Sequence, residues 1–162
     1  MCIRDSACAV LNDDMVKCWG SNANGQLGYG DTNDRGDQAN EMGNNLPTVD
    51  LGTGKTAKQV VAGGSYTCAV LNDDTVKCWG YNPNGQLGYG DTPNRGDNAN
   101  EMGNNLPTVD LGTGKTAKQV VAGDYHTCAV LNDDTVKCWG RGDYGQLGYG
   151  NPNNRGNQAN ER

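Results

Sequence analysis

The sequence predicts an all-β protein, a partial β-propeller in which four-stranded antiparallel blades follow a 60-residue repeat. The period is carried by one stretch, TCAVLNDDTVKCWGYNPNGQLG at residues 67–88, whose first cysteine recurs as Cys8, Cys68 and Cys128. A period of this order is typical of solenoids and propellers. Each unit also holds four short strand-like runs, which is the content of one propeller blade.

The recurring stretch is predicted to be a β-hairpin. Residues 67–71 and 75–79 are rich in β-branched, apolar and aromatic side chains, and the polar run 72–74 between them has turn chemistry. Both faces of the hairpin are largely apolar. We therefore expect it to be covered on both sides, because a solvated face would show a clean alternation of apolar and polar residues.

The register of this hairpin depends on the length of its loop. With a three-residue loop closed by Leu71 opposite Thr75, Cys68 falls directly opposite Cys78, within reach of a disulfide. A two- or four-residue loop would place the two cysteines on a diagonal.

Two further strands are predicted in each unit. LPTVDL at residues 46–51 alternates apolar and polar side chains, and Pro47 near its start is typical of an edge strand. AKQVVA at residues 57–62 follows a turn at residues 52–54 and leads into the next hairpin. Residues 31–45, which are mostly Asn, Asp and Gly, are predicted to form a long polar loop.

The repeats divide the chain into four parts. Residues 1–7 depart from the equivalent residues of the later copies, so we expect a non-repeat leader or a fragment end there, with no structural role for Cys2. The repeats are expected at 8–67, which lacks its leading strand, at 68–127, and at 128–162, which is incomplete. Closure of a propeller takes about four to eight blades, so we expect further repeats in a longer native chain or self-association, and breaks within repeats favour the longer chain.

Six of the seven cysteines form pairs with a ten-residue offset. Such pairs are candidates for disulfides within the hairpins, and oxidised pairs would favour an extracellular or secretory compartment. Buried free thiols in a cytosolic protein are the alternative. The pairs are Cys8 with Cys18, Cys68 with Cys78, and Cys128 with Cys138.

Composition and motifs exclude several classes of function. The net charge of −6 and the absence of a basic run argue against nucleic-acid binding, and no apolar run approaches the roughly 18 residues that membrane insertion requires. GTGKT at residues 52–56 lacks the first glycine of a phosphate loop, and the loop from Asp31 has Met42 where a calcium loop needs its glutamate. No nearby histidine completes a zinc pattern. We predict no metal and no cofactor.

Catalysis is not expected. His126 is the only histidine, and no nucleophile or carboxylate set accompanies it, so a structural hydrogen bond is its expected role.

Within the third unit, VVAGDYHTCAVLNDDTVKCWGRGDYGQLGYG at residues 120–150 resembles the repeat of the regulator of chromosome condensation family, with its His-Thr, Trp-Gly and Gly-Gln-Leu-Gly elements. The resemblance covers residues 8–162 and implies a β-propeller, commonly of seven blades. Members of the family include a guanine-nucleotide exchange factor for the small GTPase Ran, a bacterial β-lactamase inhibitor and a plant ultraviolet photoreceptor. The resemblance therefore implies a fold rather than one function.

Differences between the copies suggest partner-binding residues. Residues 8–67 and 68–127 differ at nine positions, mostly in predicted loops, and the later copies gain tyrosines and charges. Variable loops with aromatic side chains on a fixed scaffold are typical partner contacts, although neutral drift in exposed loops gives the same pattern. The candidates are Tyr81, Asp124, Tyr125, His126, Arg141, Asp143 and Tyr144.

These observations predict a non-enzymatic propeller segment that acts as a protein–protein interaction scaffold through its blade loops. The alternative is part of a guanine-nucleotide exchange factor for a small GTPase.

Overall fold

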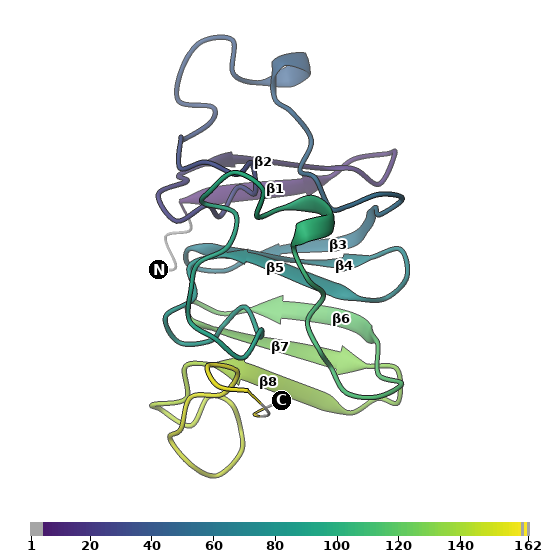
Figure 1. Cartoon of the computed structure of the whole chain (residues 1–162), viewed down its shortest axis with the longest axis vertical. Coiled ribbons are helices and arrows are strands. Elements are labelled where there is room, and N and C mark those ends of the chain that lie inside the picture. The colour runs from purple at the N-terminus through teal and green to yellow at the C-terminus, as the bar shows by residue number, and fades with distance from the viewer. Residues whose placement is uncertain (1–4, 160, 162) are drawn as a thin grey trace.

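Three antiparallel β-sheets are stacked along the long axis of the molecule (Figure 1). The computed structural model describes residues 5–159 and 161, so the expectation for Cys2 lies outside the described residues. The all-β prediction is confirmed, since the only helical elements described are two 3-10 turns, η1 (Gly43–Asn45) and η2 (Gly103–Asn105). The strands are β1 (Ser6–Val10) and β2 (Val16–Gly20) in the first sheet, β3 (Ala57–Ala62), β4 (Tyr66–Leu71) and β5 (Val76–Gly80) in the second, and β6 (Ala117–Ala122), β7 (His126–Leu131) and β8 (Val136–Gly140) in the third.

The hairpin register agrees with the prediction from the loop length. Cys68 lies opposite Cys78 and Val70 opposite Val76, and the Leu71 N–H donates to the Thr75 carbonyl at 2.8 Å. The last loop residue, Asp74, has φ +64°, a left-handed conformation that Asp tolerates better than most residues. The same register recurs in the other two hairpins.

Each hairpin is crossed by a disulfide between directly opposed cysteines. The Cα atoms are 4.1 Å apart in Cys8–Cys18, 4.0 Å in Cys68–Cys78 and 4.1 Å in Cys128–Cys138. Such short separations are typical of the non-hydrogen-bonded sites of an antiparallel pair. Both sulfur-bearing residues of the central pair are fully buried, so this disulfide lies inside the core.

The second sheet is covered on both faces, as its apolar composition predicts. Every residue of β4 and β5 is buried. One core cluster packs Leu71 and Trp79 against Leu27 of the first repeat, and the other packs Tyr66 against Leu87 and the third sheet. The neighbouring sheets therefore supply the apolar contacts that a single blade lacks.

The predicted fourth strand is not formed at residues 46–51. That segment has no assigned strand, and one backbone bond is described between it and β2, from the Val49 N–H to the Val16 carbonyl at 2.8 Å. The sheets of the described chain therefore hold two or three strands rather than four. A fourth chain segment pairs only through isolated bridges, Gly20 with Arg35, Gly80 with Arg95 and Gly140 with Arg155.

A tyrosine hydroxyl occupies the place where a fourth strand would bind. The Cys78 N–H donates to the Tyr89 hydroxyl at 2.9 Å, and that hydroxyl donates to the Cys78 carbonyl at 2.8 Å. Tyr29 and Tyr149 make the same pair of bonds to Cys18 and Cys138. One side chain thus satisfies both backbone groups in the middle of each edge strand, which leaves a fourth strand nothing to pair with there.

We expect Tyr89→Phe to lower the free energy of unfolding by about 2 kcal/mol, because it leaves a buried N–H and a buried carbonyl of Cys78 without a partner. Tyr149→Phe is the matched control. Its partner Cys138 is only half-buried, so water can replace the hydroxyl and the loss should stay below about 1 kcal/mol. Urea denaturation measures both, and equal losses would contradict the assigned role of the Tyr89 hydroxyl.

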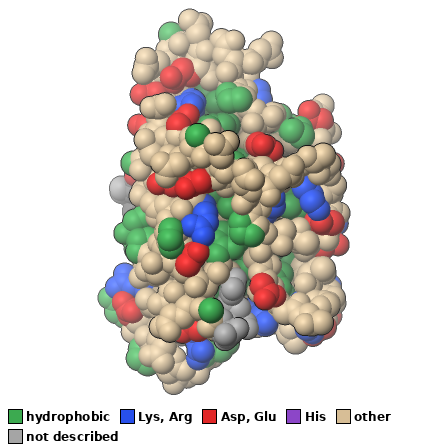
Figure 2. All heavy atoms as spheres, viewed as in Figure 1, with side chains coloured by type: hydrophobic (Ala, Val, Ile, Leu, Met, Phe, Trp, Pro, Cys, Tyr) green, Lys and Arg blue, Asp and Glu red, His purple; other side chains and the backbone are tan. Residues whose placement is uncertain are grey.

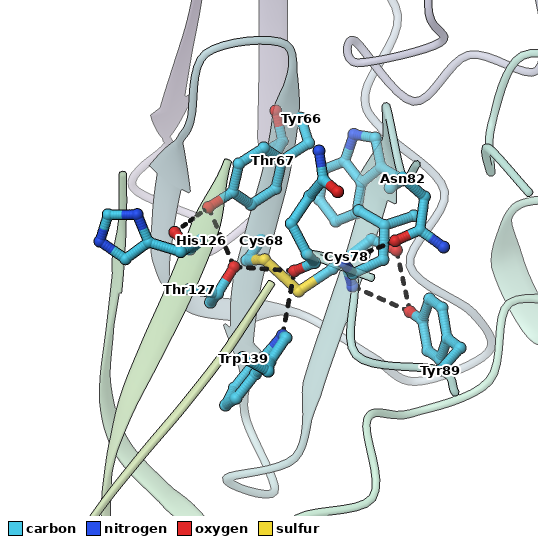
Figure 3. The surroundings of a disulfide bond; sticks show 12 residues. Tyr66, Thr67, Cys68, Cys78, Asn82, Tyr89, His126, Thr127 and Trp139 are labelled. Carbon is cyan, nitrogen blue, oxygen red and sulfur yellow. Dashed lines mark hydrogen bonds between the residues drawn. A yellow bond between two sulfur atoms is a disulfide. The ribbon is translucent and has the colours of Figure 1, made fainter. Parts of the chain in front are cut away.

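Neighbouring sheets are joined by a carbonyl from the Gly-Gln-Leu-Gly segment. The Gln26 carbonyl accepts hydrogen bonds from the Thr67 hydroxyl at 2.8 Å and the Trp79 indole at 3.0 Å. One repeat further on, Thr127 and Trp139 donate to the Gln86 carbonyl at 2.8 and 2.9 Å (Figure 3). The same contact therefore holds each successive pair of sheets together.

The glycine before each of these glutamines permits close backbone packing. Gly25 has φ +75°, and a Cβ there would overlap the backbone of Gly96 and Asp97 in the next repeat. Gly85 has the same φ and approaches Gly156 and Asn157 in the same way.

Acidic and basic side chains are interspersed on the face of the molecule shown in Figure 2. In the part of the chain that the structure describes, no helix has the length and apolar character of a membrane span.

Candidate protein-binding site

The predicted partner-binding residues gather on loops of the second and third sheets. Tyr81 follows β5, residues 123–125 connect β6 to β7, and Arg141 follows β8. These loops lie at one end of their sheets, because the turn before a hairpin and the segment after it meet at the same edge. The two segments of the third sheet border a hollow of about 280 Å³ lined by Asp124, Tyr125, His126, Arg141, Tyr144 and Gln146.

Arg141 is the centre of the cluster. Its guanidinium lies 5.8 Å from the centre of the Tyr125 ring and 5.4 Å from that of Tyr144, and its Nε donates to Asp143 Oδ2 at 2.7 Å. The hydrogen bond to Asp143 raises the pKa of Arg141. Tyr81 joins from the neighbouring blade, its ring 6.3 Å from that of Tyr125.

The rings of this cluster are open to solvent. Tyr144 is 84% exposed and Tyr125 is 39% exposed, although both contact the Arg141 guanidinium. The cation–π contacts and the ion pair restrain a long, flexible side chain, which lowers the entropy lost when a partner binds.

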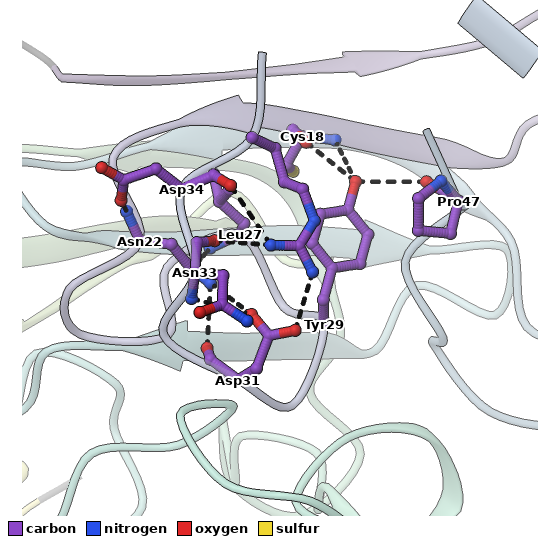
Figure 4. A network of polar contacts seen from close by, with 9 residues as sticks. Cys18, Asn22, Leu27, Tyr29, Asp31, Asn33, Asp34 and Pro47 are labelled. Carbon is purple, nitrogen blue, oxygen red and sulfur yellow. Dashed lines mark hydrogen bonds and ion pairs between the residues drawn. The ribbon is translucent and has the colours of Figure 1, made fainter. Parts of the chain in front are cut away.

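The loop that carries Arg141 and Tyr144 is built differently from the equivalent loops of the first two repeats. In the first repeat Asn22 holds the loop, accepting from the Leu27 N–H at 2.9 Å and donating to the Asp31 carbonyl at 2.9 Å (Figure 4). Gly142 stands at that position in the third repeat, and a Cβ there would overlap the Asn153 carbonyl. The third loop therefore lacks the amide side chain that braces the other two, although its backbone bonds, such as that from the Gly145 N–H to the Gly142 carbonyl at 2.8 Å, are the same.

Of the seven predicted residues, five are brought into direct contact and two line the hollow beside them. The contacting residues are Tyr81, Tyr125, Arg141, Asp143 and Tyr144; Asp124 and His126 line the hollow. The backbone carbonyl of His126 accepts a hydrogen bond from the Tyr66 hydroxyl, and its ring lies over Gly123. That these residues bind a partner stays a prediction.

Sequence reasoning missed the tyrosine of each GQLGYG segment. Tyr29 stacks under Arg35, whose guanidinium lies 5.4 Å from the ring centre and pairs with Asp31 at 2.7 Å. Burial raises the pKa of Tyr29, so its hydroxyl stays protonated and able to donate to Cys18. The sequence feature that could have identified this tyrosine is its constant position, eleven residues after the second cysteine of each pair.

Two motifs set aside in the sequence have structural contacts. Lys55 of GTGKT pairs with Asp73, and although partial burial favours a higher pKa for Asp73, Lys55 and Thr75 outweigh it and hold that pKa at about 2. Glu41 accepts the Gly36 N–H at 2.8 Å and the Gln38 N–H at 3.1 Å. Over residues 5–159 and 161, no three His, Cys, Asp or Glu side chains gather as metal ligands.

The chain matches known repeats over most of its length. Residues 13–70 and 73–130 match the family model of the regulator of chromosome condensation (RCC1) repeat, and residues 57–86 and 117–146 match a second model of the same repeat. The chain is 34% identical over 143 residues to the ultraviolet-B receptor UVR8 of Arabidopsis thaliana, a match that covers 88% of this chain and 29% of the receptor. It is 30% identical over 148 residues to protein pim1 of Schizosaccharomyces pombe, covering 88% of this chain and 26% of pim1.

A solved structure shares the fold. The crystal structure of Prp20p from Saccharomyces cerevisiae superimposes with a TM-score of 0.68 at 18% identity, over 94% of this chain and 35% of that one, and confirms the partial propeller. The chain thus spans about a third or less of the length of these relatives, between 26% and 35%. On the match of both repeat models and the shared stack of sheets, the chain belongs to the regulator of chromosome condensation (RCC1) repeat family.

Proposed function

We propose that this chain is a non-enzymatic scaffold segment that binds a protein partner through the cluster of Tyr81, Tyr125, Arg141 and Tyr144. The observation that carries the proposal is the placement of Arg141 between two exposed tyrosine rings beside a hollow of about 280 Å³. Tyrosine and arginine are enriched among the residues that dominate the free energy of protein–protein binding. A hollow of this size accepts one partner side chain.

Electrostatics favour a partner with a basic surface. The chain carries a net charge of −6, and Asp124 and Asp143 flank the cluster. Complementary charge raises the association rate and selects the partner more than it raises affinity. Family relatives support a protein as the ligand, since Prp20p has been characterised for its binding to Gsp1p and histones.

Selection of a phage-displayed random peptide library against the full chain tests the site. We expect the selected peptides to lose about tenfold or more in affinity for Tyr125→Ala and Arg141→Ala, the loss of an interface residue worth about 1.4 kcal/mol or more. The matched control is Asn24→Ala, at the position in the first repeat that corresponds to Tyr144. Peptides that bind all of these variants equally well would exclude the cluster as the binding site.

The alternative function, part of a guanine-nucleotide exchange factor, is favoured by the fold shared with Prp20p, a protein characterised for binding Gsp1p. It predicts that the chain accelerates release of labelled GDP from Gsp1p. The scaffold function predicts release at the rate of the GTPase alone.

A further inference from the structure

A chemically labile dipeptide lies in the turn before the Gln-Leu-Gly segment of the first two repeats. Asn-Gly occurs twice in the chain, as Asn24 followed by Gly25 and as Asn84 followed by Gly85. Asparagine is a thermolabile residue, and a following glycine makes it more so, because a backbone without Cβ lets the glycine nitrogen approach the asparagine side chain. Each of these turns therefore carries an asparagine that is prone to deamidation.

The deamidation needs only a base and water. The Gly25 nitrogen, once a base has removed its proton, attacks Cγ of Asn24. The bond from Cγ to the side-chain nitrogen breaks, that nitrogen takes up a proton and leaves as ammonia, and a cyclic succinimide remains. Water then opens the ring at either carbonyl. One product is aspartate, and the other is isoaspartate, in which the main chain runs through the side-chain carbons and is longer by one carbon.

The folded chain holds the first turn in a form that cannot react. The Gly25 N–H donates to the Asn22 carbonyl at 2.9 Å. The Asn24 N–H donates to Gln26 Oε1 at 2.9 Å. Gly25 is buried, and the backbone of the next repeat lies so close that a Cβ on Gly25 would overlap it. The nitrogen that must react is therefore hydrogen-bonded, shielded from bases in water and unable to turn toward Cγ of the asparagine.

The second turn is held in the same way. The Gly85 N–H donates to the Asn82 carbonyl at 3.0 Å. The Asn84 N–H donates to Gln86 Oε1 at 3.0 Å. Gly85 is buried against the backbone of the third repeat. At both turns the reaction thus requires that the interface to the next repeat separates first.

We propose that Asn24 and Asn84 are sites of spontaneous deamidation that react only when the interface to the next repeat opens. Local opening requires less free energy than unfolding of the whole chain, so each turn reaches the reactive state independently. Isoaspartate lengthens the backbone where Gly25 and Gly85 have no space to move, so the modified interface cannot close as before. Opening that leads to reaction is therefore irreversible. This modification is independent of partner binding at the tyrosine and arginine cluster.

Peptide mapping of the incubated chain tests the two sites. After reduction, trypsin releases Asn24 in residues 18–35 and Asn84 in residues 78–95, which differ in sequence, so mass spectrometry follows each site separately. We expect deamidation at both sites to be at least about tenfold slower in the native chain than in urea, because the reactive state is rare in the folded chain. Asn24→Gln is the matched control. It keeps the amide but would have to form a larger ring, so its peptide should stay unmodified at this position.

Either of two results would overturn the assignment. Equal rates in the folded and the unfolded chain would show that the interface does not control the reaction. An Asn24 peptide that stays unmodified in urea would show that the dipeptide is not a deamidation site.

Two valine substitutions distinguish opening of one interface from unfolding of the whole chain. The hydroxyls of Thr67 and Thr127 each donate at 2.8 Å to the glutamine carbonyl of the preceding turn. Thr67→Val should speed deamidation of Asn24 about twofold to tenfold and leave Asn84 unchanged, since it removes a bond from the first interface alone. Thr127→Val should have the reverse effect. Acceleration of both sites by either variant would overturn the proposal, because unfolding of the whole chain would then be the route.

The effect on the interface is measured on chains that have been deamidated in urea without reduction and then refolded. We expect the isoaspartate form to unfold at a lower urea concentration than the unmodified chain. Asn24→Asp should lower the midpoint less, since its backbone has the normal length. An isoaspartate chain with the midpoint of the unmodified chain would overturn the inference that the modified interface cannot close.

Discussion

Replacing Gly25 with alanine is expected to lower the free energy of unfolding by about 3 kcal/mol or more. Part of the loss comes from the left-handed backbone conformation at φ +75°, which is about 1–2 kcal/mol less favourable for alanine than for glycine. The rest arises because the new Cβ overlaps backbone atoms of Gly96 and Asp97, which cannot move aside as a flexible side chain can, and overpacking of this kind costs about 1–3 kcal/mol.

Gly54→Ala separates these two contributions. Gly54 has φ +69° but open space around its Cβ, so we expect a loss of only about 1–2 kcal/mol from the backbone conformation. Urea denaturation of both variants measures the difference. If both lose the same stability, the close packing of Gly25 against the next repeat contributes nothing measurable to the stack.

Removing the central disulfide is expected to have the second large effect. The Cys68→Ala, Cys78→Ala double variant should lose about 2–3 kcal/mol, the chain entropy of a loop closed across ten residues, with a further loss from the space left in the core. The same double substitution at Cys128 and Cys138 is the control for burial. These residues are half-buried, so the entropic loss should be similar and the packing loss smaller.

Thiol alkylation of the unfolded, unreduced chain checks the pairing itself. We expect the six paired cysteines to resist modification until a reductant is added, and peptide mapping should recover three links with a separation of ten residues. Modification of all seven cysteines before reduction would instead identify free thiols. The oxidising compartment proposed from the cysteine pairs would then lose its support.

The hairpins could be predicted from sequence because their determinants are local. A three-residue polar loop between two apolar arms leaves one register in which both Cys68 with Cys78 and Val70 with Val76 are opposed. Turn chemistry and cross-strand pairing act within about a dozen residues, and one sequence contains all of that information.

The fourth strand was mispredicted because its competitor is a tertiary contact. Residues 46–51 have the alternation of a strand, but the Tyr29 hydroxyl already binds the outward backbone groups of Cys18 on β2, as Tyr89 does at Cys78 on β5. A side chain that substitutes for a strand leaves no periodic pattern. The bonds that the Gln26 carbonyl accepts could not be predicted from the sequence either, since a backbone acceptor does not depend on residue type.

The sequence predicts which residues make up the candidate site, but it does not predict the contacts between them. Variation between copies singled out Tyr81 and Tyr125, yet their contact depends on how successive blades stack. The ion pair between Arg141 and Asp143 is local, whereas the stacking of Arg141 on Tyr125 joins two loops on either side of a hairpin.

The tyrosine hydroxyls that bind β2, β5 and β8 also help an array of near-identical repeats to avoid misassembly. An open strand edge is a template for adding another chain, and repeats with the same sequence offer one another well-matched strands during synthesis. Tyr29, Tyr89 and Tyr149 each occupy one donor and one acceptor at the centre of such an edge. Each repeat thereby protects its own edge from aggregation before the next repeat has folded.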